Sequence, residues 1–452
     1  MNPLTTIAEH AAALREGRTS SVALTEAALE RIQSPAGEGA RTFTRVDADG
    51  ARAAARASDE LGSVGRRRSA IDGLPISIKD LFDVAGETTM AGSAARRGEP
   101  PAAVDAPVVQ RLRAAGAVIV GKTNMTEFAF SGLGINPHYG TPLNAWDRAS
   151  GRIPGGSSSG AAVSVTDGMA VAGIGSDTGG SVRIPAALCG LVGFKPTARR
   201  VPLQGAVPLS TSLDSIGPIA PTVACCAALD AILSGTEASG VPRPASLHGL
   251  RLAVPRTVAL DGMDDHVART FGATLSRLSA AGALVQELDI PAFARLAGIN
   301  AQGGLTAAES WWWHRDLVAR AADRYDPRVV SRIQRGQAIS AADYLELLQA
   351  RATWIAEVDA ALDGFDAMLM PTSPIVAPKV KELAASDDAY YRANGLILRN
   401  PTLVNFLDGC ALSVPCHARE TAPVGLMVAG PALADRRILA IGLAVEAVLA
   451  VR

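Results

Sequence analysis

The chain has 452 residues, of which 48% are hydrophobic and 19% charged, so it can bury a large core. Its formal net charge of -1 gives no electrostatic footprint for nucleic acid or for an anionic membrane. This composition therefore disfavours a nucleic-acid-binding or membrane-surface protein and favours small neutral substrates.

The predicted elements alternate between helices and strands along the whole chain. Helical periodicity begins at 7–14 and continues at 22–32, where Ser20 or Ser21 could serve as the N-cap. This interleaving favours a three-layer α/β/α architecture. The further predicted elements are a helix at 104–115 and strands at 74–78, 118–120, 250–254, 283–288, 367–370, 412–414 and 424–428.

We expect one domain over residues 1–452. The segment Val241-Pro242-Arg243-Pro244 is typical of a connector, and the residues from 266 to 363 are mostly helical in pattern. We interpret this stretch as a helical cap or subdomain at roughly 260–365, inserted before the sheet resumes. The alternative is a full second domain.

The five cysteines show no CxxC pairing, which suits neither a disulfide framework nor a zinc site. Residues 1–18 carry acidic and polar side chains where a signal peptide needs a long apolar core. No uncharged apolar run approaches the ~18 residues of a membrane span. We therefore expect a cytoplasmic protein without a metal site.

The first of two glycine-serine clusters is Gly155-Gly156-Ser157-Ser158-Ser159-Gly160. Its composition fits a flexible linker, but the apolar segment that follows is typical of packed structure. The cluster also matches GxSxG, with Ser158 as nucleophile and His417 as base, although the strand that this elbow needs before it is missing. A third hypothesis is the phosphate loop of a nucleotide-binding module, but no GK[ST] ending follows.

The second cluster is Asp177-Thr178-Gly179-Gly180-Ser181. Two glycines before a serine let successive backbone N–H groups converge on one point, because neither glycine has a Cβ. Such a nest suits an oxyanion hole, whereas the alternative is a tight turn at the end of a strand. We expect Asp177 to hold this loop through hydrogen bonds to the backbone, and Arg183 to make a structural pairing.

Lys79 follows the apolar stretch 74–78 and is one of five lysines among 43 basic residues. Arginine does not release its proton in a protein, whereas a desolvated lysine does, so a site that needs a neutral amine must use lysine. The pKa of Lys79 would have to fall from ~10.4 to ~7 for this role. We interpret Lys79 as a candidate base, against the alternative of a solvated strand residue.

With both clusters and this lysine, the chain resembles the amidase signature enzymes. The resemblance covers nearly the whole chain and implies a large mixed central sheet. It departs from the family pattern mainly at Ser159, where glycine is usual, and at Ser176, where threonine is usual. Its motifs are Gly73–Asp80, Gly121–Met125, Pro154–Gly160, Asp177–Pro185, Cys189–Thr197 and Pro423–Met427.

The resemblance implies a Ser-Ser-Lys triad, with Ser181 as the nucleophile, Ser157 as a bridging serine with a cis peptide bond, and Lys79 as the ultimate base. A serine hydroxyl is a poor nucleophile until a base takes its proton, and a second hydroxyl can relay that proton. In such a relay no histidine is needed, so we expect His138, His314 and His417 to be dispensable.

The resemblance also implies the groups that surround the reacting carbonyl. Ala129 and Ser131 are the candidates for substrate contact, and Phe128 and Phe130 indicate an apolar pocket. The Trp311-Trp312-Trp313 run could wall this pocket, but adjacent residues on a helix point in different directions. Besides Ser181, the oxyanion donors would be the backbone N–H groups of Thr178, Gly179 and Gly180.

We therefore predict an amidase, without metal or cofactor, that hydrolyses the carbon–nitrogen bond of a small apolar or aromatic amide through an acyl-enzyme on Ser181. Carbamate (urethane) and urea-type substrates of the same triad stay open, as does an α/β-hydrolase-type esterase that uses Ser158. Another alternative is a glutamine amidotransferase subunit that passes ammonia to a transfer-RNA-charging partner. The expected assembly is a homodimer without nucleic-acid or membrane partners.

Overall fold

A computed structural model of the chain describes residues 4–237 and 240–450. Within these residues eleven strands form one mixed sheet, in the order β1-β3-β2-β4-β6-β5-β10-β11-β9-β7-β8. The strands are β1 (Phe43–Val46), β2 (Pro75–Lys79), β3 (Val118–Thr123), β4 (Ala172–Asp177), β5 (Val192–Lys195), β6 (Ser215–Ala220), β7 (Arg251–Pro255), β8 (Leu284–Leu288), β9 (Ala367–Pro371), β10 (Cys410–Pro415) and β11 (Gly425–Gly430).

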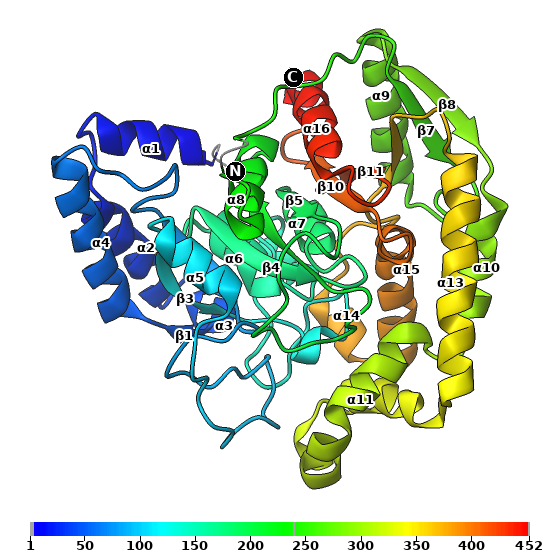
Figure 1. The fold of residues 1–452 in the computed structure, drawn as a ribbon, viewed down its shortest axis with the longest axis horizontal. Helices are drawn as coiled ribbons and strands as arrows, with labels where there is room; N and C mark the ends of the chain where they lie inside the picture. The colour runs from blue at the N-terminus through cyan, green and yellow to red at the C-terminus, as the bar shows by residue number, and fades with distance from the viewer. Residues whose placement is uncertain (1–3, 238–239, 451–452) are drawn as a thin grey trace.

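Helices cover both faces of this sheet (Figure 1). They are α1 (Ile7–Arg15), α2 (Ser21–Gln33), α3 (Gly39–Thr42), α4 (Ala48–Ser63), α5 (Pro107–Ala114), α6 (Ser159–Thr166), α7 (Arg183–Cys189), α8 (Val223–Ser234), α9 (Asp265–Ala280), α10 (Pro291–Ile299), α11 (Gly304–Ala321), α12 (Pro327–Gln334), α13 (Ala341–Ala361), α14 (Val380–Ala384), α15 (Asp387–Phe406) and α16 (Asp435–Ala450).

The alternation of side chains along each central strand produces the three layers. In β11, Leu426 and Val428 belong to the core cluster that includes α8 and α16. The side chains between and beyond them, Met427 and Ala429, belong to the cluster that includes α13 and α15. Because both faces of the strand are buried, apolar helices must cover both, which gives the α/β/α arrangement.

Most of the predicted elements are confirmed. Ser20 is the N-cap of α2, because its side chain accepts a hydrogen bond from the backbone N–H of Ala23. Every strand that the sequence analysis predicted is present, as is the helix within 104–115. No strand was predicted from the sequence at β1, β4, β5 or β6. β6 was not predicted because it contains Gly217 and Pro218, residue types that are rare inside strands. Pro218 nevertheless lies opposite Ile174 of β4 in the centre of the sheet.

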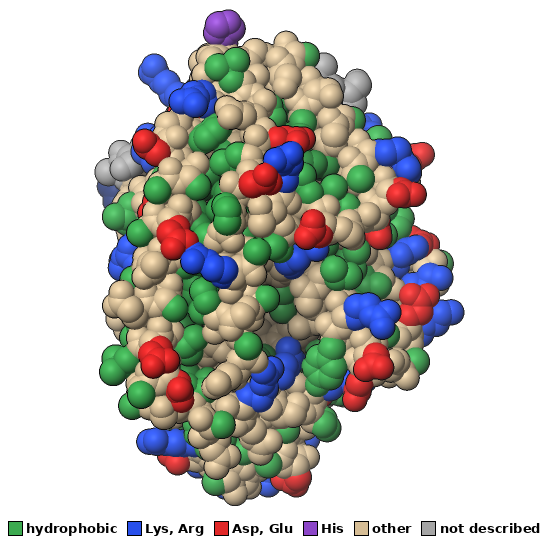
Figure 2. Space-filling view, turned by 90° about the vertical axis from the view of Figure 1, so that its right-hand side faces the viewer, with side chains coloured by type: hydrophobic (Ala, Val, Ile, Leu, Met, Phe, Trp, Pro, Cys, Tyr) green, Lys and Arg blue, Asp and Glu red, His purple; other side chains and the backbone are tan. Residues whose placement is uncertain are grey.

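The mostly helical stretch contains α9 to α13 together with β8, and α13 runs along one side of the molecule (Figure 1). β7, β8 and β9 belong to the same sheet as the N-terminal strands. The division of the chain into domains stays a prediction. On the face that Figure 2 shows, acidic and basic side chains are interspersed. Within residues 4–237 and 240–450, no helix is both long enough and apolar enough to span a bilayer.

Candidate active site

The second glycine-serine cluster connects β4 to α7 and lies in the interior of the molecule. β4 ends at Asp177, and α7 begins at Arg183, two residues after Ser181. Gly180 has a φ of 120°, and a Cβ there would lie 2.5 Å from the Cβ of Pro401. Only glycine therefore fits this position, both by its backbone conformation and by the space available.

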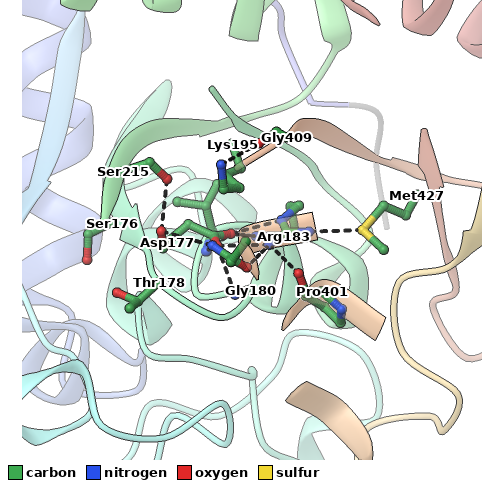
Figure 3. Close-up of polar contacts among 12 residues, drawn as sticks. Ser176, Asp177, Thr178, Gly180, Arg183, Lys195, Ser215, Pro401, Gly409 and Met427 are labelled. Carbon is green, nitrogen blue, oxygen red and sulfur yellow. Dashed lines mark hydrogen bonds and ion pairs between the residues drawn. The ribbon is translucent and has the colours of Figure 1, made fainter. Parts of the chain in front are cut away.

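Asp177 holds the glycine loop from inside. Its carboxylate accepts hydrogen bonds from the backbone N–H groups of Gly180 at 2.8 Å and of Val182 at 3.1 Å. The guanidinium of Arg183 donates to both carboxylate oxygens, at 2.9 and 3.0 Å. The structural roles expected for Asp177 and Arg183 are therefore confirmed. Figure 3 shows Asp177 directed at Arg183, with Ser176 and Thr178 on the other side.

This ion pair is completely buried, and every charge in it is balanced. Both side chains have an exposed fraction of 0%. Burial acts to raise the pKa of Asp177, but the charge and hydrogen bonds of Arg183 hold that pKa well below its usual range. Arg183 also donates to the carbonyl of Pro401 at 3.1 Å and to Asn405 Oδ1 at 2.6 Å. The loop is thus anchored to α15 as well as to its own strand.

The first cluster approaches the same place from another direction. The Gly156–Ser157 peptide bond is cis, in agreement with the resemblance. Gly156 donates its N–H to the carbonyl of Gly132 at 2.8 Å, and the carbonyl of Ser157 accepts from the N–H of Thr126 at 3.0 Å. A Cβ on Gly156 would lie 2.5 Å from the backbone nitrogen of Gly134, so glycine is required for this close approach.

Lys79 is the last residue of β2, and its side chain is fully buried. Its Nζ lies 2.7 Å from Ser157 Oγ and 2.8 Å from Ser176 Oγ. Burial lowers the pKa of Lys79 from 10.5 to about 7, although the negative charges of Asp214 and Asp177 act to raise it. The alternative of a solvated strand residue is therefore wrong. The contact between Lys79 and Ser176 was not predicted from the sequence, where the one signal for it was that Ser176 stands at a position where threonine is usual.

Backbone contacts bring Ser181 to this cluster. The N–H of Ser158, the residue after Ser157, donates to the carbonyl of Ser181 at 3.3 Å.

Ser158 itself does not occupy a strand-to-helix elbow, because no strand precedes it directly. Its hydroxyl donates to the carbonyl of Ser176 at 3.3 Å. His417, the base in the elbow hypothesis, lies beside Gly190 at the C-terminal end of α7, since a Cβ on Gly190 would lie 3.3 Å from its ring. Ser181 lies at the opposite, N-terminal end of that helix.

The residues expected around the oxyanion are held by two carboxylates. The hydroxyl of Thr178 donates to Asp214 Oδ1 at 2.5 Å, and the N–H of Gly180 is engaged by Asp177. Asp214 also accepts from the backbone N–H groups of Leu209 and Ser210. Burial raises the pKa of Asp214 to about 6. Asp214 was not predicted as a site residue, because nothing in a lone aspartate 36 residues after Thr178 indicates their contact.

A cavity of about 310 Å3 opens beside these groups. Ser176 and Thr178 line it, as does Ala129, whereas the hydroxyl of Ser131 is directed to Asn394 Oδ1 at 2.8 Å. Most of the other lining side chains are apolar. They include Leu81, Leu203, Val207, Leu209, Ile216, Trp312 and Trp313.

The three consecutive tryptophans have different surroundings. Trp312 and Trp313 line the cavity, whereas Trp311 does not, and both Trp311 and Trp313 pack against the core. The ring of Trp313 lies 6.1 Å from that of Phe128, which also contacts His314 at 4.4 Å between centroids. Burial lowers the pKa of His314 to about 3, so this histidine is neutral at physiological pH. These aromatic contacts support the wall that Ala129 contributes to the cavity.

The family model described as Amidase matches residues 23–439. The chain belongs to the amidase signature family. This amidase is 38% identical to 2-amino-5-chloromuconic acid deaminase of Comamonas testosteroni, over 98% of this chain and 96% of the relative. It is 34% identical to the A subunit of glutamyl-tRNA(Gln) amidotransferase from Chloroflexus aurantiacus, over 97% of this chain and 95% of the relative.

Solved structures show the same architecture as this amidase. A crystal structure of an amidase has a TM-score of 0.88 and 34% identity, and the match covers 98% of this chain and 99% of that chain. The peptide amidase bound to chymostatin has a TM-score of 0.83 and 27% identity, with coverage of 98% and 97%. The three-layer fold is therefore confirmed. The protein is an enzyme of the class that hydrolyses carbon–nitrogen bonds of amides.

We expect Ser176→Ala to lower kcat of this amidase roughly fivefold, because it removes one of the two hydroxyls that hold Lys79 and a hydrogen bond contributes about 1 kcal/mol. Steady-state hydrolysis of an aryl amide measures this effect. Ser176→Thr is the matched control, since it retains the hydroxyl and should keep kcat within about threefold. An Ala variant with unchanged kcat would show that Lys79 needs no second anchor.

Proposed function

We propose that this amidase cleaves its substrate through an acyl-enzyme on Ser181, with Lys79 as the base and Ser157 as the proton relay. The observation that most supports this mechanism is the buried amine of Lys79, 2.7 Å from the hydroxyl of Ser157. With a pKa lowered to about 7, a useful fraction of this amine is neutral at physiological pH. A neutral amine can accept the proton of Ser157 while it donates to Ser176.

In the first half-reaction, Ser181 Oγ attacks the carbonyl carbon of the amide. Its proton passes to Ser157 Oγ as the proton of Ser157 passes to Lys79 Nζ. Collapse of the tetrahedral intermediate breaks the carbon–nitrogen bond, and the leaving nitrogen receives the proton back along the same relay. The products are an ester on Ser181 and free ammonia or an amine. In the second half-reaction water replaces Ser181 as the nucleophile, and a carboxylic acid is released.

The developing oxyanion needs donors that already point at its position. We assign this role to the backbone N–H groups of Thr178, Gly179 and Ser181. The N–H of Gly180 is bonded to Asp177, so Gly180 contributes its conformation to this hole instead of a free donor. The Thr178 hydroxyl is engaged by Asp214, which fixes the start of the loop.

An active-site label tests the assignment of the nucleophile. We expect a fluorophosphonate to add to Ser181, as mapped by intact-protein mass spectrometry and peptide analysis. Ser181→Ala and Lys79→Ala should abolish both turnover and labelling, and Ser157→Ala should reduce turnover severely. Ser158→Ala is the matched control and should label normally. An adduct on Ser158, or near-wild-type turnover in a folded triad variant, would contradict the proposal.

The pH dependence tests the base. Protonated Lys79 cannot accept a proton, so kcat/KM should rise by about tenfold per pH unit well below pH 7 and level off above that pH. The negative charge of Asp214 raises the pKa of Lys79. Asp214→Asn should therefore move the midpoint of this profile to lower pH. A profile that is flat between pH 5 and 9 would eliminate Lys79 as the base.

The lining of the cavity supports a neutral, apolar or aromatic acyl group. Among the described residues that line it, Asp214 carries the one ionisable side chain, and a carboxylate repels an anionic substrate. Trp312 and Trp313 also line the cavity and offer flat apolar surface there. We therefore propose an uncharged amide, unlike the acid for which the 38% identical relative is named. Carbamates and urea derivatives of similar shape stay within this proposal.

Substrate preference tests this lining. We expect a neutral aryl amide to have a kcat/KM at least tenfold above that of its carboxylate-bearing analogue. Trp312→Ala should raise KM for the aryl amide roughly fivefold through the loss of about 1 kcal/mol of aromatic contact. Leu345→Ala is the control, because Leu345 is similarly exposed, 64% against 60% for Trp312. Equal effects of the two substitutions, or a preference for the carboxylate, would contradict the proposed substrate class.

The amidotransferase role is a second candidate, supported by the relatives named as the A subunit of glutamyl-tRNA(Gln) amidotransferase. A protein of that kind would co-purify with partner subunits from its native host and hydrolyse glutamine, whereas the proposed amidase would purify without them and prefer aryl amides. The homodimer and the cytoplasmic location stay predictions. Sedimentation of the purified protein tests the dimer.

A further inference from the structure

A second cavity, of about 650 Å3, adjoins the catalytic one. We call it the arginine groove, because four arginines line it. They are Arg111 of α5, Arg199 and Arg200 in the segment after β5, and Arg351 of α13. Asp408 is the one carboxylate among its described lining residues. The groove shares Leu203, Gln204 and Thr211 with the catalytic cavity.

Two of these arginines are neutralised by carboxylates. Arg200 makes a bidentate pair with Asp230, whose carboxylate accepts hydrogen bonds at 2.7 and 3.1 Å. The side chain of Asp230 is almost fully buried, at 1% exposure, so this pair belongs to the protein's interior. Arg199 pairs with Asp408 at the surface, and its own side chain is 63% exposed.

The other two arginines have no carboxylate partner within the described residues. Arg111 donates to the carbonyl of Leu233. Arg351 donates to the carbonyl oxygens of Phe406 at 2.9 Å, Asn405 at 3.2 Å and Ser212 at 3.3 Å. A carbonyl oxygen satisfies a donor but does not cancel a charge. Asp408 and Glu309 are near enough to act on the charge of Arg351, so the four guanidinium groups are set against three carboxylates, those of Asp230, Asp408 and Glu309.

Guanidinium groups suit a particular ligand chemistry. They stay charged in proteins, and their planar forks match the oxygens of phosphates and carboxylates. An arginine that is partly desolvated and lacks a counter-charge gains most from such an anion. The arginines here come from three separate segments, so the excess of positive charge depends on the fold and is not a run of basic sequence.

We propose that the arginine groove binds a small polyvalent anion of the phosphate or polycarboxylate kind. Arg111 and Arg351 make no ion pair within the described residues and supply the excess of positive charge, and the exposed Arg199 lies at the surface of the groove. Because Leu203, Gln204 and Thr211 line both cavities, an anion in the groove lies against the wall of the catalytic cavity. The arginine groove differs from the catalytic cavity, which has no basic lining residue among the described residues.

Isothermal titration calorimetry of the full chain tests this site, with sodium pyrophosphate and sodium citrate as separate probes at constant ionic strength. We expect saturable binding of at least one probe with one site per chain. Arg199→Gln and Arg111→Gln should each weaken it at least tenfold, because each removes a guanidinium from the groove. Arg256→Gln is the matched control, since Arg256 is an exposed arginine paired with Asp289 and does not line the groove. Thermal unfolding verifies that each variant is folded.

Pyrophosphate binding without citrate binding would identify a phosphate ligand, and the reverse would identify a polycarboxylate. The proposal is overturned if neither probe binds saturably. It is equally overturned if the folded Arg199→Gln and Arg111→Gln variants bind as tightly as the wild type, or if Arg256→Gln weakens binding as much as they do. None of these results depends on amide hydrolysis, so they are independent of the proposed mechanism.

Discussion

The arrangement of the active site depends on the buried ion pair between Asp177 and Arg183. Asp177 accepts from the backbone of the glycine loop and from the guanidinium at the same time, so one carboxylate determines where the loop turns. Arg183 in turn bonds to α15. An isolated charge at this depth would be very costly, and the pair persists because each group is held by several hydrogen bonds as well as by its partner's charge. Ser181 is positioned by the short segment that this pair constrains.

The period-2 geometry of β4 then separates structural groups from chemical ones. Asp177 points to the ion pair, whereas Ser176 and Thr178 point to the opposite side, as Figure 3 shows. Ser176 contacts Lys79, and Thr178 contacts Asp214. A shift of one residue along this strand would place the Asp177 carboxylate beside Lys79 and would move the Ser176 hydroxyl away from it. The sheet register is therefore as important to the site as the identities of its residues.

Lys79 illustrates how the fold balances opposing electrostatic effects. Complete burial favours the neutral amine, and the two nearby aspartates favour the ammonium ion. The result is a pKa of about 7, close to the value at which a base is most effective at physiological pH. The charge of Asp177 is compensated by Arg183, which is bonded to both of its carboxylate oxygens. The ion pair with Arg183 thus also reduces the net negative charge that acts on Lys79.

The sequence by itself determined the family of the chain and the candidate residues of the site. The scarcity of lysine indicated Lys79 as a candidate base, and the resemblance to the amidase signature enzymes implied Ser157 and Ser181. The structural roles of Asp177 and Arg183 were expected from their own neighbours, because such signals are local in the chain. The sequence also predicted most strands and the α/β layering from periodicity. It predicted no strand for β6, because propensity disfavours glycine and proline and only burial between β4 and β5 makes that segment a strand.

The tertiary structure alone decided which distant residues surround that chemistry. Ser176 reaches Lys79 across 97 residues, and Ser131 turns to Asn394 across 263. Asp214, the different surroundings of the three tryptophans and the convergence of arginines from α5 and α13 likewise depend on how separate segments pack. Periodicity and motif spacing describe neighbours along one element, whereas contacts between elements depend on sheet order and helix packing. The lining of the cavity and the convergence of arginines in the groove belong to this second kind of information.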